Sequence, residues 1–126
     1  MSPSKRRVLV VDDDADIRRL ASLSLEKVGG HEARTASSGE EAVRTAASWQ
    51  PDVIVMDFRM PGMDGPATLE RLRQSVVTRD IPVVFLTASV HRSALVALTE
   101  LWPAGVLEKP FDPMSLSDEL AELLDW

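Results

Sequence analysis

The sequence predicts an α/β protein in which five short strands alternate with five helices and form a doubly wound parallel sheet. Three observations predict this fold. Runs rich in β-branched residues recur along the chain, with RVLVV at 7–11, VIVM at 53–56 and VVFL at 83–86. These runs have little polar alternation, which is typical of strands covered on both faces. Helical patterns separate them, and right-handed crossovers leave few other ways to wind such a chain.

Length and composition predict one soluble domain. The chain has 126 residues, enough for one domain with a substantial core and too few for two of ordinary size. We therefore expect a single domain over residues 1–126, with a core from about 7 to 124 and a flexible tail at 1–6. There are no cysteines, no signal peptide pattern, and no run approaching the roughly 20 apolar residues that cross a bilayer. These features predict a cytoplasmic protein without membrane contact.

Two weaker segments complete the predicted sheet. HEARTAS at 31–37 alternates in polarity, as an exposed edge strand does. GVLEK at 105–109 is a shorter apolar run and is the predicted last strand.

The helices are predicted from apolar residues at helical spacing and from their end signals. The first ends at Gly29-Gly30, the second begins with a capping box of Ser38 and Glu41, and the third has Pro66 in its first turn. The apolar positions are Ile17, Leu20, Ala21, Leu25 and Val28; Val43, Ala46 and Ala47; Leu69, Leu72 and Val76; Val90, Ala94, Leu98 and Leu101; and Leu116, Leu120, Leu123 and Leu124.

Chemically active side chains follow the carboxyl ends of four predicted strands. The first strand runs into Asp12 and Asp13, and the others end at Asp57, Thr87 and Lys109. In a doubly wound sheet these ends line the crevice where ligands bind. Clustered carboxylates stay ionised together only beside a cation, and oxygen ligands favour Mg²⁺. A carboxylate beside Mg²⁺ and a lysine is suited to attack phosphorus, so we predict that Asp57 accepts a phosphoryl group.

Each site residue also has a purely structural interpretation. Asp14 or Asp16 can cap the first helix, Thr87 can be a cap, and Lys109 can be a surface charge beside a proline turn. Their joint occurrence at four strand ends favours a site. The net charge of -6 and pI near 4.8 argue against direct nucleic-acid binding, and the short KRR run at 5–7 is interpreted as a solvated terminus.

Four motifs in order, VLVVDDD, DVIVMDFRMPGMDG, VVFLTAS and VLEKPF, resemble those of the receiver domain of a two-component response regulator, from about Arg7 to Leu124. The resemblance implies a flavodoxin-like strand order 2-1-3-4-5 and phosphorylation of Asp57 by a histidine kinase or a histidine phosphotransfer protein. It also implies that Mg²⁺ binds to Asp12, Asp13, Asp57 and the backbone carbonyl of Arg59. Thr87 and Lys109 are then expected to contact the phosphoryl group, and the Lys109-Pro110 bond to be cis.

The resemblance further implies a signalling switch rather than an enzyme that acts on a separate product. The domain is expected to catalyse its own phosphorylation and slow dephosphorylation, and to change the face formed by helix 4, strand 5 and helix 5. Kinase docking is expected near Ala15, Ile17 and Arg18. We expect a stand-alone domain, monomeric or dimeric on phosphorylation, with output through a partner that the sequence does not identify.

Three other functions are compatible with parts of this sequence. The family commonly has an aromatic residue three positions before the lysine, where this chain has Val106, so a degenerate receiver that binds partners without phosphorylation is the main alternative. A haloacid-dehalogenase-type phosphatase needs an aspartate two residues after the nucleophile, where this chain has Arg59. A nucleotide-binding protein needs a glycine-rich first loop, and here that loop is acidic.

Overall fold

The computed structural model describes residues 5–88 and 100–126, and its centre is a parallel sheet. The sheet has five strands in the order β2-β1-β3-β4-β5, as predicted. The strands are β1 (Arg7–Val11), β2 (Glu32–Ala36), β3 (Val53–Asp57), β4 (Val83–Thr87) and β5 (Gly105–Glu108). The polar run expected at one edge is β2, and the weak fifth run is β5 at the other. The α/β class and the strand order are therefore confirmed.

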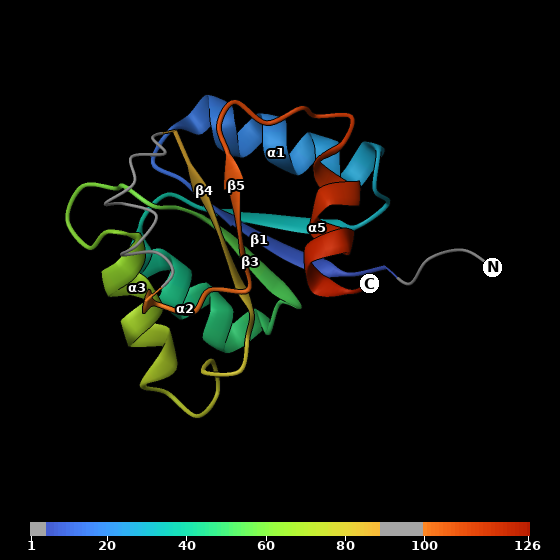
Figure 1. Cartoon of the computed structure of the whole chain (residues 1–126). Helices are drawn as coiled ribbons and strands as arrows, with labels where there is room; N and C mark the ends of the chain where they lie inside the picture. The colour runs from blue at the N-terminus through green and yellow to red at the C-terminus, as the bar shows by residue number, and fades with distance from the viewer. Residues whose placement is uncertain (1–4, 89–99) are drawn as a thin grey trace.

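Helices cover both faces of the sheet. Figure 1 shows α1 and α5 on one side and α2 and α3 on the other. The described helices are α1 (Ala15–Lys27), α2 (Gly39–Trp49), α3 (Gly65–Arg73) and α5 (Leu116–Leu124). The predicted helix through Val90, Ala94 and Leu98 lies outside the described residues. Among the residues described, no helix combines the length and the apolar character needed to cross a lipid bilayer.

Alternate residues of the central strands pack into two separate core layers. On one face, Leu9, Ile54 and Phe85 lie with buried residues of α2 and α3. On the other face, Val8 and Val55 lie with buried residues of α1 and α5. Successive side chains of a strand point to opposite faces, so a strand buried on both faces must be apolar throughout. This explains why the strand runs show so little polar alternation.

Most helix ends follow the sequence signals, with two differences. Asp14 is the N-cap of α1, and its carboxylate accepts hydrogen bonds from the amides of Asp16 and Ile17. At α2, Ser38 accepts from the amide of Glu41, but the Glu41 carboxylate accepts from the backbone and hydroxyl of Ser37. In the expected capping box the Glu41 carboxylate would accept from the Ser38 amide. It accepts instead from Ser37, one residue earlier, because the chain before Ser38 turns the Ser37 donors toward Glu41.

The third helix is shorter than its apolar pattern suggests. It ends at Arg73, and Val76, the last residue of the pattern, lies in the following turn with 73% of its surface exposed. A single apolar residue one turn beyond Leu72 does not extend a helix when no core surface lies opposite it. The prediction for this end of the helix was therefore wrong, and the exposed valine belongs to a different surface.

Candidate functional site

Three aspartates converge at the carboxyl end of the sheet. Asp12 follows β1 and is buried, Asp57 is the last residue of β3 and is also buried, and Asp13 is exposed. One carboxylate oxygen of each lies within 4.8 Å of the others. The predicted cluster therefore forms, because β1 and β3 are neighbours and end at the same edge of the sheet.

Lys109, which directly follows β5, also reaches this cluster. Its Nζ donates to Asp12 Oδ2 at 2.8 Å and lies 3.3 Å from Asp57 Oδ1. The backbone amide of Lys109 donates to the Thr87 carbonyl at 2.8 Å, and the following Lys109-Pro110 bond is cis, as expected. One ammonium is thus held between two carboxylates that come from separate strands.

The electrostatics of the cluster favour a further cation. Burial and then the neighbouring charge of Asp12 raise the pKa of Asp57 above its ordinary value, although Lys109 opposes this. Burial by itself lowers the pKa of Lys109, but its hydrogen bond to Asp12 and the charge of Asp57 outweigh burial, so the pKa is raised. The cluster holds three carboxylates, and the Lys109 ammonium pairs with two of them, Asp12 and Asp57, which leaves uncompensated negative charge. Oxygen donors with excess negative charge suit a small hard cation.

Two contacts that shape the cluster were not predicted from the sequence, although Arg18 was expected to belong to the kinase-docking surface. Arg18 donates from Nη1 to the backbone carbonyl of Asp12 at 2.7 Å and so fixes the chain at the end of β1. At Gly65, a Cβ would lie 2.8 Å from the Asp57 carbonyl oxygen and 2.9 Å from Phe85 Cε1. Only glycine, which has no Cβ, can lie this close to the Asp57 carbonyl oxygen. The Asp-Gly-Pro order at 64–66 was the available signal for that position.

The other predicted site residues lie at the same edge of the sheet. Thr87 is the buried last residue of β4, next to β3. Arg59 is exposed, and its amide donates to Asp57 Oδ1 at 3.4 Å. Phe58, Arg59, Met60 and Asp64 line a hollow of about 340 Å³ directly after Asp57. The site is therefore open on the side of the loop that follows β3.

Val106 lies in β5, in the packed layer on one face of the sheet. It is partly buried, packs against the core on the α2 and α3 face, and pairs in register with Phe85. Val106 therefore contributes to the packing of the core at this position.

Comparison with known proteins gives one consistent result. Residues 8–121 match the family model described as the response regulator receiver domain. Over 124 residues the chain is 35% identical to a probable transcriptional regulator ycf27 of Cyanophora paradoxa, covering 98% of this chain and 50% of that protein. The chain thus spans about half the length of the curated relatives it matches first.

Solved structures show the same fold. The chemotaxis response regulator CheY4 of Vibrio cholerae, crystallised at low pH, has a TM-score of 0.87 and 31% identity, with 95% of this chain and 99% of that chain covered. A putative response regulator from Chloroflexus aurantiacus has a TM-score of 0.87 and 34% identity, with 98% and 100% covered. Both likenesses cover nearly the whole of this chain.

Proposed function

Because this chain belongs to the response regulator receiver domain family of two-component signalling, we propose that it is a phosphorylation-dependent switch with Asp57 as the phosphoacceptor. The observation that carries the proposal is the position of the Asp57 carboxylate. It is buried at a strand end, 3.3 Å from the Lys109 ammonium and within 4.8 Å of two further carboxylates. A nucleophile for phosphorus needs such neighbouring positive charge and a site for a divalent cation.

The proposed reaction transfers a phosphoryl group from a phosphohistidine of a histidine kinase or a histidine phosphotransfer protein. A carboxylate oxygen of Asp57 forms a bond to phosphorus while the phosphorus–nitrogen bond breaks. The donor imidazole nitrogen keeps the electron pair of that bond. Lys109 neutralises charge on the transferring oxygens, and the Thr87 hydroxyl donates to one of them. The chain thereby modifies itself and is not an enzyme with a separate product.

The donor set fits Mg²⁺ by its chemistry. Asp12, Asp13 and Asp57 supply only oxygen atoms, and we propose the backbone carbonyl of Arg59 as a fourth protein ligand. When bound, Mg²⁺ would supply positive charge next to the transferring phosphoryl oxygens. The hydrogen bond from Arg18 to the Asp12 carbonyl would keep the first of these ligands in place.

We propose that residues 1–126 act as one receiver domain that signals through a protein partner. The partner surface would be the face of β5, α5 and the segment before β5, altered by phosphorylation, with no direct nucleic-acid contact. The domain would be a monomer or a phosphorylation-dependent dimer, and kinase docking is proposed near Ala15, Ile17 and Arg18. The output protein is proposed only as a class, a protein that binds this face.

One observation favours a second candidate function. In receivers with an aromatic residue at this position, the ring is expected to turn inward as the threonine hydroxyl moves toward the phosphoryl group. Val106 has no ring; it packs against the core and pairs in register with Phe85. A degenerate receiver would use the same surface to bind a partner without phosphorylation. Labelling with a small phosphodonor separates the two functions, because only the switch requires a covalent adduct.

The test is intact-mass analysis after incubation with a small acyl phosphate and Mg²⁺. We expect one phosphoryl adduct, absent without Mg²⁺ and absent in Asp57→Asn. Asp52→Asn is the matched control, since Asp52 precedes β3 at the opposite end of the same strand, and it should label normally. A stable adduct on Asp57→Asn, or no adduct on the unmodified chain with Mg²⁺, would contradict the assignment.

A further inference from the structure

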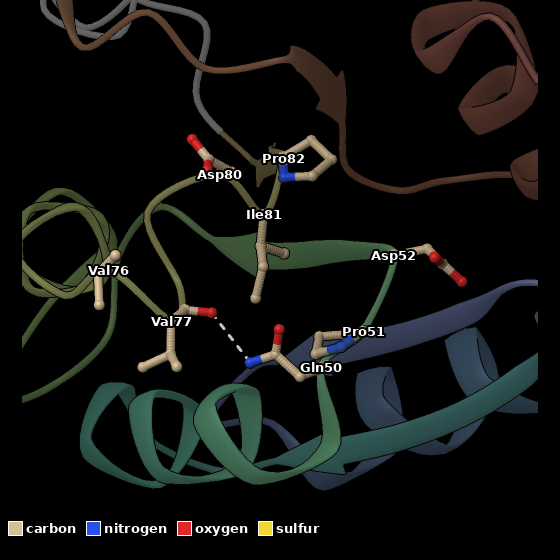
Figure 2. Close-up of a pocket in the computed structure, with 8 residues that line it drawn as sticks. All are labelled: Gln50, Pro51, Asp52, Val76, Val77, Asp80, Ile81 and Pro82. Carbon is tan, nitrogen blue, oxygen red and sulfur yellow. Dashed lines mark hydrogen bonds between the residues drawn. The ribbon is translucent and has the colours of Figure 1, made fainter.

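A groove lies at the amino ends of β3 and β4, at the opposite end of the sheet from the aspartates. Its volume is about 500 Å³, within the roughly 300–1,000 Å³ typical of ligand pockets. The walls come from two segments, residues 50–52 before β3 and residues 76–82 before β4. Figure 2 shows the two segments facing each other across the groove. The proposed function makes no use of this surface.

Five of the eight residues that line the groove are aliphatic. Of these, Pro51, Ile81 and Pro82 are at least partly buried. Val76 and Val77 flank it and are 73% and 54% exposed. Two adjacent valines left this open at the edge of an apolar groove form more apolar surface than one isolated exposed residue.

The polar side-chain atoms that the groove leaves available are hydrogen-bond acceptors. The Gln50 side-chain nitrogen donates to the carbonyls of Ala46 and Ala47 at 3.1 Å and of Val77 at 2.9 Å. Since all three partners are acceptors, the nitrogen must face them, and this sets the orientation of the amide. Figure 2 shows the amide oxygen turned toward Ile81, and no described residue donates to it.

The charged lining is entirely negative. Asp52 and Asp80 are the charged side chains of the lining, and both are exposed. The Asp52 carboxylate accepts from the amide of Arg7 at 2.8 Å, which orders it without neutralising it. Asp80 makes no hydrogen bond or ion pair within residues 5–88 and 100–126. Acceptors and carboxylates on aliphatic walls favour a ligand that carries a cationic donor on an apolar stem.

We propose that this groove binds a segment of a partner protein that presents an arginine or lysine side chain between aliphatic residues. The stem of the basic residue would lie on Pro51 and Ile81, with its head near the Gln50 amide oxygen. Asp52 and Asp80 stand on opposite sides of the groove (Figure 2) and would attract the positive charge from its rim. The flanking aliphatic residues would cover Val76 and Val77. A free small cation would leave both valines in water, so the occupant is a peptide segment rather than a metabolite.

The test is an NMR titration of the full chain with three probes. The first is a blocked tripeptide of leucine, arginine and leucine. The second has citrulline, the uncharged isostere of arginine, at its centre, and the third is n-butylguanidinium. We expect the arginine peptide to shift the amides of Gln50, Val77 and Ile81, and to bind at least threefold more tightly than either other probe. Equal binding of the citrulline peptide would overturn the cation site, and equal binding of n-butylguanidinium would overturn the peptide occupant.

Variants that each remove one negative charge test whether the carboxylates of the groove attract the peptide. Asp80→Asn and Asp52→Asn should each weaken the arginine peptide about two- to fivefold, the range expected for one exposed charge pair. Asn at position 52 can still accept from Arg7, so the fold is preserved. Asp118→Asn on α5 removes the same charge away from the groove and should leave the affinity unchanged. An equal loss in all three variants would indicate attraction to the acidic protein as a whole and would contradict a defined site.

Discussion

Polar side chains have different roles at the two ends of the sheet. At the carboxyl end, Asp12, Asp13 and Asp57 lie together, and the Lys109 ammonium pairs with Asp12 and Asp57, so negative charge remains in excess. At the amino end, the buried His31 uses both ring nitrogens, one accepting from the Arg6 amide at 3.3 Å and one 3.1 Å from the Ser117 hydroxyl. The first arrangement leaves a negative charge that suits a cation, while the second joins elements of the fold.

The difference shows that a polar residue beside a sheet is not by itself evidence of a site. His31 also packs against the Trp126 ring at 5.5 Å, and Arg6 lies over the same ring. These contacts hold Trp126 against the residues at the start of β1 and β2, so removing one should lower the free energy of unfolding. Removing a group at the acidic end should mainly change chemistry. The predictions below test this contrast.

The largest effect is expected for Lys109→Ala. Loss of the ammonium should slow phosphorylation of Asp57 by about a hundredfold, the usual scale for removing one electrostatic stabiliser of a transition state. Mg²⁺ affinity should be unchanged or higher, because a competing cation is gone. Stopped-flow fluorescence with an acyl phosphate measures the rate, and Lys27→Ala on α1 is the control. Unchanged kinetics would show that Lys109 does not act on the phosphoryl group.

At the amino end, Gly29→Ala should destabilise the fold without affecting phosphorylation. A Cβ at position 29 would lie 2.7 Å from His31 Cδ2 and 2.8 Å from Ser117 Cβ. Overpacking of this kind costs about 1–3 kcal/mol, and we expect the upper half of that range. Urea unfolding measures it. Gly30→Ala, with a φ of 70° and open space around the added Cβ, should cost less, about 1 kcal/mol. A smaller loss in Gly29→Ala than in Gly30→Ala would contradict the packing described here.

Asp13→Asn should stabilise the metal-free protein, whereas Gly29→Ala should destabilise it. Removing one of three like charges should raise the metal-free stability, by roughly 0.5–1 kcal/mol because Asp13 is exposed and its repulsion is screened. Mg²⁺ should stabilise the unmodified chain and have much less effect on the variant. Thermal unfolding with and without Mg²⁺ tests both points. A variant less stable than the parent without metal, with an equal Mg²⁺ response, would show that the three carboxylates do not act together.

The pH dependence of the metal-free protein follows from the same cluster. Since the pKa of Asp57 is raised by burial and by Asp12, the folded state holds this proton more tightly than the unfolded chain. Its contribution to stability is present below the ordinary carboxylate pKa and is lost as pH rises through the raised value. Asp57→Asn should remove this decline in urea unfolding series from acidic to neutral pH. An identical decline in the variant would assign it to other groups.

The smallest effect concerns His31 and has the opposite pH dependence. Burial, and then the charge of Arg6, lower the pKa of His31 below 6.5. The unfolded chain then binds this proton more tightly, so stability is full above the unfolded pKa and falls as pH decreases through the lowered folded value. The pH series should show this loss on the acid side of neutrality, and His31→Gln should abolish it. Persistence of the loss in His31→Gln would contradict the assignment.

Much of the fold could be predicted because its signals are local. Strand runs buried on both faces show as continuous apolar segments, and helix starts show as side-chain caps such as Asp14. The end of α3 was misplaced at Val76 because an apolar residue at helical spacing does not reveal whether core surface lies opposite it. Glu41 was predicted to reach Ser38 and instead accepts from Ser37, since the turn before the helix sets the direction of those donors.

The alternation of strands and helices, and the acidic, hydroxyl and basic residues at the strand ends, follow from residue type and period along the chain and can be predicted from the sequence. Which side chains meet depends on how the whole chain folds. Lys109 reaches Asp12 across 97 positions, and Gly65 passes close beneath Asp57. The groove lined by Gln50 and Ile81 likewise forms where the residues before β3 meet those before β4. Such contacts depend on strand order and loop path, which distant parts of the chain set together when they pack around one core.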